Sequence, residues 1–389
     1  MNILLLGVGL QGRATLYDLV RCPAVTRVVA ADADLAALTR YVDRLKSSKI
    51  EAVGLDARDP ARMATLMQGM QAVIVLLPVS FHVPVARLAV DHGLHLVNSS
   101  YPPPEFADLG RDAAARGLTI LPEFGFDPGI DLVLAGQAVR ELDEVHEFYS
   151  YGAGFPEATA ATGPLRYKIS WTFEGVLKSY LRDAEVVREG KRVTIPGREI
   201  FAASNIHTVT VEEFGGLEAY PNGNAMHYLE ALKIAATIKN AGRFAMRWPG
   251  HAAFWYPLAQ LGFLDDAPIR VGESLISPRS VVRDLLEPQL QYAENERDVA
   301  VIRVDVRGLK NGRRRRLLYQ VIDFRDLSSG LLAMNRTVGF TASIGAQMIL
   351  RGDIRKRGLA SPLSDVPTDV FFGELRARGI VVQREEMDW

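Results

Sequence analysis

The chain has 389 residues, of which 48% are hydrophobic and 23% charged, the composition of an ordinary globular protein. Its 45 Lys and Arg residues nearly balance 46 Asp and Glu residues, and a net charge of -1 offers no electrostatic attraction to a nucleic acid. No run reaches the roughly 18 apolar residues that a membrane span requires. We therefore expect two or three globular domains, with no nucleic-acid partner and no membrane partner.

Cysteine and histidine usage points to a reducing compartment and to chemistry without a metal. The single cysteine, Cys22, cannot form an internal disulfide, and the first residues lack the pattern of a secretory signal. The seven histidines are scattered, without the H-x-x-x-H or C-x-x-C spacing of metal sites. We expect a cytoplasmic protein with no metal site, and the absence of G-x-S-x-G and Walker A patterns argues against hydrolases and NTPases.

Short apolar runs alternate with amphipathic segments over the first 125 residues. The apolar runs lie at 2–6, 27–31, 51–55, 72–77, 95–97 and 118–121, and the expected helices at 12–20, 35–46, 60–67, 83–92 and 105–116. Pro60 after Asp59 is typical of a helix start. This alternation predicts an α/β fold, with a Rossmann domain built on a doubly wound parallel sheet at 1–130.

From about residue 135 the expected elements are mainly strands, followed by a helical tail. We predict strands at 145–151, 166–171, 186–195, 208–213, 299–306 and 317–324, and Asn311-Gly312 before the last of these is a strong hairpin signal. The pattern predicts an α+β second domain with a mixed or antiparallel sheet at 131–335. The remaining segment, 336–389, is expected to be helical at 337–350 and 370–378. The basic run 313–316 beside the hairpin turn is interpreted as a solvent-exposed sheet edge.

A glycine-rich motif lies directly after the first predicted strand and at the start of a helix. Residues 7–12 read GVGLQG and match G-x-G-x-x-G. Gly7 permits the tight turn, Gly9 lets the backbone approach a pyrophosphate, and Gly12 lets the helix pack closely on the strand. A diphosphate would rest on the helix N-terminus, so Leu10 and Gln11 are also candidate contacts. The context predicts a dinucleotide site.

Acidic and polar residues at the ends of the following strands are further cofactor candidates. Asp32 lies twenty residues after Gly12, where an acid would bind the adenosine ribose and repel a 2'-phosphate, which favours NAD over NADP. Asp34 is an alternative to it. Asp56 either faces the adenine or caps a surface helix, and the sequence leaves both open. The remaining candidates end the fourth and fifth strands, where either cofactor contact or plain loop geometry applies: Leu77, Pro78, Asn98 and Ser99.

The segment 121–131, LPEFGFDPGID, together with the glycine motif, resembles a signature of the saccharopine dehydrogenase superfamily. Further similarity is carried by 97–101 (VNSSY), by 167–177 (YKISW to EGVL) and by 247–251 (RWPGH), so the resemblance extends from residue 1 to about 350. Within the superfamily the chain is most similar to single-module NAD-dependent lysine 6-dehydrogenases. The resemblance implies a Rossmann domain, a substrate and oligomerisation domain, and carboxy-terminal helices that return to the Rossmann side.

One segment departs from the superfamily pattern. Residues 219–225, AYPNGNA, resemble the Y-P-N-R-D-S segment of saccharopine reductases, whose arginine helps to hold a substrate carboxylate. Here Gly223 stands at the arginine position and Asn224 at the acid. Because glycine cannot clamp a carboxylate, we expect a substrate other than saccharopine, with lysine or another amino acid or amine favoured.

Candidate catalytic residues follow from the deamination that the resemblance implies. Oxidising an amine requires a proton acceptor near the nitrogen. Glu123, directly after the last Rossmann strand, is the first candidate, with a structural role at the domain junction as the alternative. Asp127 either caps a helix or binds substrate. Lys168 is a candidate acid, base or carboxylate anchor, or else an exposed strand residue.

Three further residues are candidate substrate contacts. The resemblance makes Arg247 a candidate partner of an α-carboxylate and His251 a proton relay, with structural roles as the alternatives. Tyr101 is a secondary candidate. We expect an NAD-dependent oxidoreductase acting on CH-NH2 or CH-NH groups, similar to L-lysine 6-dehydrogenase. The alternatives are reductive C-N coupling of the saccharopine or carboxynorspermidine type, and a non-catalytic NAD-binding protein. We also expect a small-molecule substrate and a homo-oligomer.

Overall fold

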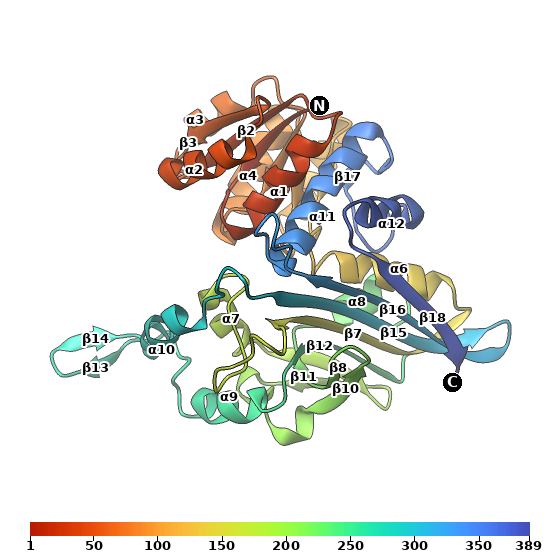
Figure 1. Ribbon diagram of the computed structural model, residues 1–389. Coiled ribbons are helices and arrows are strands. Elements are labelled where there is room, and N and C mark those ends of the chain that lie inside the picture. The colour runs from red at the N-terminus through yellow and green to blue at the C-terminus, as the bar shows by residue number, and fades with distance from the viewer. The chain divides into compact units, whose positions relative to one another are not determined.

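The computed structural model describes residues 1–389, which form two compact units (Figure 1). Unit 1 comprises residues 1–134 and 335–381, and unit 2 comprises residues 135–334 and 382–389. Unit 1 has the predicted α/β fold on a parallel sheet, and unit 2 has the predicted mixed sheet. The expected fold class is therefore confirmed.

Unit 1 is built on a seven-stranded parallel sheet. The strands follow the order β17-β6-β5-β4-β1-β2-β3. Their bounds are β1 Asn2–Leu6, β2 Arg27–Asp32, β3 Ile50–Gly54, β4 Ala72–Val75, β5 His95–Asn98, β6 Thr119–Leu121 and β17 Gly358–Leu359. The order reverses at β1, whose two neighbours are β2 and β4. Such a switch point opens a crevice at the carboxyl ends of the strands, where ligands of this fold class bind.

Seven helices accompany this sheet. They are α1 Leu10–Arg21, α2 Leu35–Leu45, α3 Pro60–Met67, α4 His82–Asp91, α5 Phe106–Ala115, α11 Ala333–Arg351 and α12 Thr368–Ala377. Helix α3 starts as expected, because the Asp59 carboxylate accepts a hydrogen bond from Arg62 N at 2.9 Å. Residues 335–381 thus add α12, most of α11 and the edge strand β17 to unit 1, and β17 was not predicted from the sequence.

Unit 2 contains a nine-stranded mixed sheet. Its main path is β10-β11-β12-β7-β15-β16-β18, with β8 beside β12 and β9 beside β8. Only β7 and β12 are parallel to each other. The bounds are β7 Glu144–Pro156, β8 Ala184–Arg188, β9 Lys191–Ile195, β10 His207–Val211, β11 Gly215–Pro221, β12 Asn240–Arg247, β15 Asp298–Lys310, β16 Arg313–Phe324 and β18 Val382–Asp388.

Two strand predictions in this unit were wrong. Residues 166–171 form no regular strand, and Arg166 has a left-handed φ of 46°. The single strand expected at 186–195 is the hairpin of β8 and β9, which turns at Glu189 (φ 52°) and Gly190 (φ 74°). The predicted turn at Asn311-Gly312 is present, with φ of 53° and 71° joining β15 to β16. Both residues have the positive φ of a type I′ hairpin turn.

The helices of unit 2 are short, and a separate hairpin completes it. The helices are α6 Ile130–Arg140, which begins in unit 1, α7 Phe173–Ser179, α8 Met226–Ala231, α9 His251–Gln260 and α10 Pro278–Leu286. The hairpin of β13 (Ile269–Val271) and β14 (Ser274–Ile276) extends beyond α10 (Figure 1). No helix of the protein has the length and apolar character needed to cross a membrane.

The sheet of unit 2 packs side chains on both of its faces. Because alternate residues of a strand point to opposite faces, Tyr220 and Ala245 belong to one core cluster and Tyr151 and Phe244 to another. We call the first the Arg247 face, since Arg247 lies two residues after Ala245 on β12. The second is called the Tyr151 face. The two faces are therefore chemically separate surfaces of one sheet.

Candidate active site

The glycine motif forms a tight turn between β1 and α1. Gly7 has a φ of 88°, and a side chain there would meet Leu76 O at 2.7 Å. A Cβ on Gly12 would lie 2.0 Å from Gly7 O, so only glycine lets α1 begin this close to the turn. Nothing lies within 4 Å of the place where Gly9 would carry a side chain. The surface in front of Gly9 is therefore open to a ligand, as a pyrophosphate site requires.

Asp32 ends β2 and connects it to the glycine turn. One carboxylate oxygen accepts a hydrogen bond from Val8 N at 2.7 Å, and the other accepts from Asp34 N at 2.9 Å. The alternative acid, Asp34, accepts from Ala37 N at 2.8 Å and caps α2. Asp32 is therefore the acid that lies beside the glycine turn, while Asp34 stabilises a helix start.

The other candidates of this unit divide between the turn and the surface. Leu10 is 43% exposed, and the Gln11 side chain accepts a hydrogen bond from Asn335 Nδ2 at 3.0 Å. Asp56 pairs with exposed Arg58 at 2.6 Å, and this hydrogen-bonded ion pair lowers the pKa of Asp56 to about 2. Asp56 therefore lies in a surface turn and does not cap a helix, since Asp59 caps α3, and its contact with the adenine stays a prediction. Pro78 is exposed, and Leu77 O contacts His82 Nε2 at 2.9 Å.

Asn98 ends β5 and Ser99 follows it, beside the segment that carries Glu123. The Asn98 side chain is fully buried, its Oδ1 accepts from Ser100 N at 3.0 Å, and its Nδ2 has no partner among the protein atoms. A buried donor without a partner costs free energy, so a ligand acceptor would stabilise it. Ser99 packs against Gly125, where a Cβ would come within 2.7 Å of the Ser99 Cβ. The open Gly9 surface and the Asn98 amide fit a dinucleotide.

Glu123 has a strained backbone directly after β6. Its φ is 56°, it is 5% exposed, and its N donates to Ser100 O at 3.0 Å. A non-glycine residue in this region costs about 1–3 kcal/mol, and such strain concentrates at functional sites. Tyr101, the other candidate in this part of unit 1, is 40% exposed. Burial of Glu123 at the strand end is compatible with either of the roles predicted for it.

Asp127 lies in the turn that precedes α6. Gly125 N donates to Pro128 O at 3.0 Å, and Ile130 N donates to Gly125 O at 3.1 Å, so the turn closes on itself. Gly129 N donates to the Asp131 carboxylate at 2.7 Å, which places a second acid at the helix start. Asp127 itself is partly exposed. Its assignment to substrate binding stays a prediction.

In unit 2, Lys168 is part of an ion pair. Its Nζ lies 2.5 Å from Glu296 Oε2, with side-chain exposures of 15% and 21%. This attraction helps to hold the pKa of Glu296 below its usual range, against the raising effect of burial. Because the segment 166–171 is irregular, Lys168 is not the exposed strand residue that we considered as the alternative. Its assignment to catalysis stays a prediction.

Arg247 ends β12 as a buried cation that forms no ion pair. Its cross-strand neighbour on β11 is Glu218, whose carboxylate instead accepts hydrogen bonds from Gly250 N at 3.1 Å and Ala252 N at 2.5 Å. It is 8% exposed, its Nη1 donates to Met246 O at 2.7 Å, and its guanidinium lies 5.4 Å from the Tyr167 ring centroid and 6.0 Å from that of Tyr220. Its Nε has no partner. Tyrosine faces stabilise a cation only modestly, so the site is suited to an anionic group from outside the protein.

His251 begins α9 within the same cluster. It is 2% exposed, its Nε2 lies 2.9 Å from the Tyr180 hydroxyl, and its Nδ1 is buried without a partner. Burial, and secondarily Arg247, lowers the pKa of His251 well below its usual range. The ring is therefore neutral at physiological pH, so one of its two nitrogens carries a hydrogen and the other is an acceptor. Arg247 and His251, predicted separately, are thus brought together.

Three tyrosines complete this cluster and were not predicted as site residues. Tyr220 stacks on His251 at a ring distance of 5.9 Å, and Tyr167 contacts it edge to face at 5.8 Å. The Tyr167 hydroxyl has no partner, and burial raises the pKa of Tyr167 to about 12. Tyr180 is fully buried. Tyr167 and Tyr220 lie in segments that carry the family resemblance, which is the one signal that could have indicated them.

Gly223, which stands where saccharopine reductases have an arginine, lies two residues after the end of β11. Gly223 has a φ of 79°, with open space where its side chain would begin. The Asn224 side chain accepts from Met226 N at 2.8 Å. No ionic group therefore stands at this position. No group of three or more His, Cys, Asp or Glu side chains is placed to hold a metal ion.

Comparisons with known proteins agree with this division of the chain. Residues 3–121 match the family described as "Saccharopine dehydrogenase NADP binding domain", and residues 125–380 match "Saccharopine dehydrogenase C-terminal domain". A saccharopine dehydrogenase [NADP(+), L-glutamate-forming] of Schizosaccharomyces pombe is 26% identical over 461 residues, covering 100% of this chain and 99% of the relative. The α-aminoadipic semialdehyde synthase of Arabidopsis thaliana is 27% identical, but this chain spans only 37% of its length.

A solved structure has the same fold. It is the apo saccharopine dehydrogenase (L-Glu forming) of Saccharomyces cerevisiae, with a TM-score of 0.87, 23% identity and coverage of 99% of both chains. The name of the S. pombe relative specifies NADP rather than the NAD that Asp32 predicts. What the family and these relatives share is a nicotinamide dinucleotide and the oxidoreduction of an amino-acid C-N bond. The chain therefore belongs to the saccharopine dehydrogenase family of oxidoreductases, which act on CH-NH groups.

Proposed function

We propose that this protein oxidises a C-N bond of an amino acid, or forms that bond in the reverse direction, with NAD as its cofactor. The observation that carries the proposal is the buried guanidinium of Arg247. Its contacts are Met246 O and the tyrosines at 167, 180 and 220. The carboxylate of its cross-strand neighbour Glu218 is hydrogen-bonded to Gly250 N and Ala252 N and forms no ion pair with it. A buried cation without a counter-ion is costly, and a substrate carboxylate would form a charge-assisted pair with it.

The chain's own groups suit the proton transfers of this reaction. A bound nicotinamide would supply the acceptor for the hydride that leaves the carbon bearing the nitrogen. Glu123, buried beyond the end of β6, would take the proton from the substrate nitrogen, since a carboxylate positioned beside a reacting amine can act as a general base. His251 is neutral, so its unpartnered Nδ1 can relay a proton to or from water. Asp127 and Lys168 remain candidate proton donors, and Tyr101 a candidate substrate contact.

The first candidate reaction involves a secondary amine of the saccharopine type. Oxidation converts the C-N bond to an imine, and water then hydrolyses it to a carbonyl compound and a free amine. This candidate is supported by the activity in the name of the S. pombe relative, a saccharopine dehydrogenase that aligns with the whole chain. The reverse reaction is the reductive coupling that we considered as an alternative from the sequence.

The second candidate is oxidative deamination of a primary amine, as in L-lysine 6-dehydrogenase. It is favoured by Gly223 and Asn224, which leave no ionic group where saccharopine reductases have an arginine and an acid. Saccharopine carries more carboxylates than lysine, and Arg247 is the buried arginine that lies in the cluster of Tyr167, Tyr220 and His251. With one such clamp, a substrate bearing a single carboxylate is the better match.

An assay of products separates these reactions. The purified protein would be incubated with NAD and either L-saccharopine or L-lysine, and NADH, glutamate and ammonia would be measured. Glutamate formed from saccharopine supports the first candidate, and ammonia formed from lysine supports the second. If neither substrate reacts, NADH would be supplied with an aldehyde or keto acid and an amino acid together. Failure of that reaction as well would favour the non-catalytic NAD-binding alternative.

The carboxylate assignment is tested by replacing Arg247 with Met. The variant removes an uncompensated buried charge, so we expect the free energy of unfolding to stay the same or rise. The KM for the amino acid should rise at least about tenfold, because a charge-assisted hydrogen bond is lost. The KM for NAD should not change. Arg182→Gln, which removes an exposed arginine of the same unit, is the control.

We also propose that the protein is a homo-oligomer of the cytoplasm. The hairpin of β13 and β14 exposes Ile269, Val271 and Leu275, each more than half accessible. An isolated two-stranded hairpin is marginally stable in water, so contact with a second copy would stabilise it. Leu275→Lys should reduce the mass measured by sedimentation if this hairpin is part of the contact. The cytoplasmic assignment depends on the single free cysteine, Cys22.

A further inference from the structure

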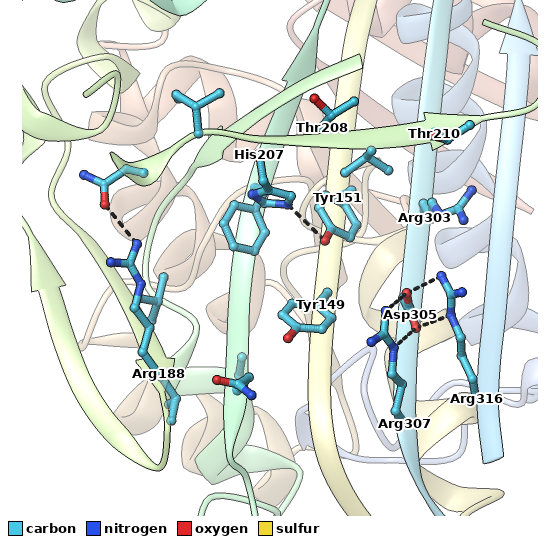
Figure 2. Close-up of a pocket in the computed structure, with 18 of the residues that line it drawn as sticks. Tyr149, Tyr151, Arg188, His207, Thr208, Thr210, Arg303, Asp305, Arg307 and Arg316 are labelled. Carbon is cyan, nitrogen blue, oxygen red and sulfur yellow. Dashed lines mark hydrogen bonds and ion pairs between the residues drawn. The ribbon is translucent and has the colours of Figure 1, made fainter. Parts of the chain in front are cut away.

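A pocket of about 640 Å³ lies on the Tyr151 face of the unit 2 sheet. Its floor comes from neighbouring strands in register, since Tyr151 lies opposite Arg303 of β15 on one side and Phe244 of β12 on the other. Strand β10 provides His207, whose Nε2 lies 3.2 Å from the Tyr151 hydroxyl (Figure 2). Arg247 projects from the opposite face of β12, so this pocket is separate from the candidate active site.

The pocket carries an excess of positive charge. Arginines 188, 303, 307 and 316 line it, and Asp305 is its one acidic residue. Asp305 is 3% exposed and lies between Arg307 and Arg316, each of which contacts both of its oxygens at 2.6–3.2 Å (Figure 2). Arg307 also pairs with Glu147 outside the pocket, at 3.0 Å. Arg307 and Arg316 are therefore the two arginines of the pocket that form ion pairs with acids, namely Asp305 and, for Arg307, also Glu147.

Arg303 and Arg188 form no hydrogen-bonded ion pair with an acid. Arg303 Nη1 donates to the neutral side chain of Gln320 at 3.0 Å, and Arg188 Nη2 donates to that of Asn205 at 2.9 Å. Burial lowers the pKa of Arg303, and the opposing attraction of Asp305 and Glu385 only partly offsets the cost of burying its charge. An anion placed beside Arg303 would remove that cost and complete the set of charges.

The walls of the pocket are aromatic and apolar beside these cations. Tyr151 and Phe244 stack with ring centroids 5.3 Å apart, and His207 meets Phe244 edge to face at 4.6 Å. A volume of this size accommodates a small organic molecule, and apolar walls with a few charged groups are typical of ligand sites. An inorganic ion alone would leave the aromatic wall unused.

We propose that this pocket binds a small organic anion, with its phosphate or carboxylate group at Arg303 and its apolar portion against Tyr151 and Phe244. The site is independent of the dinucleotide and amino-acid sites. It would let a metabolite bind to the sheet that also carries Arg247. Arginine forms bidentate contacts with both phosphate and carboxylate, so the experiment must distinguish the two.

The test measures binding of phenyl phosphate, phenylacetate and inorganic phosphate by calorimetry. NAD is present at saturation, so that the phosphate-binding turn of unit 1 is occupied. We expect an aromatic anion to bind, and Arg303→Gln to weaken its binding at least about tenfold. Whichever of phenyl phosphate and phenylacetate binds with the lower Kd identifies the anionic group that the pocket prefers. Inorganic phosphate should bind more weakly than phenyl phosphate, because it does not reach the aromatic wall.

Two further variants keep the test decisive. Arg188→Gln changes an exposed arginine at the rim and should also weaken binding, even if Arg303→Gln does not fold. Arg182→Gln removes an exposed arginine of the same unit outside the pocket and should leave binding unchanged. The proposal is overturned if none of the three probes binds at millimolar concentration, or if Arg303→Gln and Arg188→Gln bind as the unaltered protein does. The proposal is also overturned if Arg303→Gln and Arg188→Gln change the sedimentation of the protein but leave its affinity for the probes unchanged. That result would assign this face to contact with a second copy of the chain.

Discussion

Asp32 supports the glycine turn, because its carboxylate accepts from Val8 N and Asp34 N. We predict that it also binds the adenosine ribose of the cofactor. For Asp32→Ala we predict that the Kd for NAD rises about tenfold or more and that discrimination against NADP is relaxed, because the repulsion of a 2'-phosphate is removed. Fluorescence titration with both cofactors measures this.

Asp34→Asn is the matched control for that prediction. It removes an acid two residues away while keeping a side-chain oxygen that can cap α2. NAD and NADP affinities should stay close to those of the unaltered protein. Equal NAD and NADP constants for Asp32→Ala and the unaltered protein would show that Asp32 does not select the cofactor. Preference of the unaltered protein for NADP would contradict the NAD proposal directly and align this chain with its named relatives.

Glu123 combines burial, a left-handed backbone and a position at the end of β6. For Glu123→Gln we predict that kcat falls about 100-fold or more while NAD affinity changes little, since the amide keeps the shape but cannot accept a proton. Steady-state kinetics and NAD titration of the same preparation measure both quantities. Near-normal turnover would return Glu123 to a structural role in the loop beside Ser100.

At the scale of elements, a buried ion pair joins α1 to α11 and α12. The carboxylate of Asp18 accepts from Arg378 Nε at 2.6 Å and Nη2 at 3.0 Å, and from Ser343 Oγ at 2.6 Å. The two side chains of the ion pair are only 8% and 13% exposed. The carboxy-terminal helices of unit 1 are thus attached to the helix that follows the glycine turn.

We predict that Arg378→Ala lowers the free energy of unfolding by about 3–5 kcal/mol, because it leaves the charge of Asp18 buried without its partner. Urea unfolding followed by circular dichroism measures the change. Breaking the exposed pair of Asp56 and Arg58 by Arg58→Ala is the control and should have little effect, since water solvates both groups. A loss for Arg378→Ala no larger than that of the control would show that the pair contributes nothing to stability.

At the scale of the whole molecule, several histidines are held neutral by burial. Burial lowers the pKa values of His82, His207 and His251, and it lowers that of His95, with help from Arg357, to about 4. In the unfolded chain these side chains take up protons below about pH 6.5, whereas the folded protein excludes them. The unfolded state then binds more protons, so the free energy of unfolding falls as the pH decreases.

We predict that the urea midpoint falls between about pH 7.5 and about pH 5.5, and that His95→Gln reduces this fall. The contribution of His95 is fully present above pH 6.5 and is lost progressively as the pH approaches 4. His92→Gln, at an exposed position, should leave the pH dependence unchanged. A variant at His95 with the same pH dependence as the unaltered protein would contradict the assignment.

Local chemistry allowed the sequence alone to determine the nucleotide-binding half of this protein. The strand, turn and helix around Gly7 and Gly12 form within a dozen residues, and the spacing to Asp32 spans one helix and one strand, so their geometry follows from neighbouring residues. The hairpin at Asn311 follows in the same way from a turn that requires positive φ. The family resemblance also depended on contiguous segments.

Only the tertiary structure decided which distant residues share a site. Arg247 and His251 meet Tyr167, Tyr180 and Tyr220, which come from separate segments whose own patterns indicate only burial. Three other features also bring together residues that are distant in the sequence. They are the pairing of β17 with β6, the ion pair of Asp18 with Arg378 across 360 positions, and the arginine-lined pocket on the Tyr151 face. Burial, pKa and the absence of a counter-ion depend on the whole surroundings of a group, and those surroundings exist only once the chain has folded.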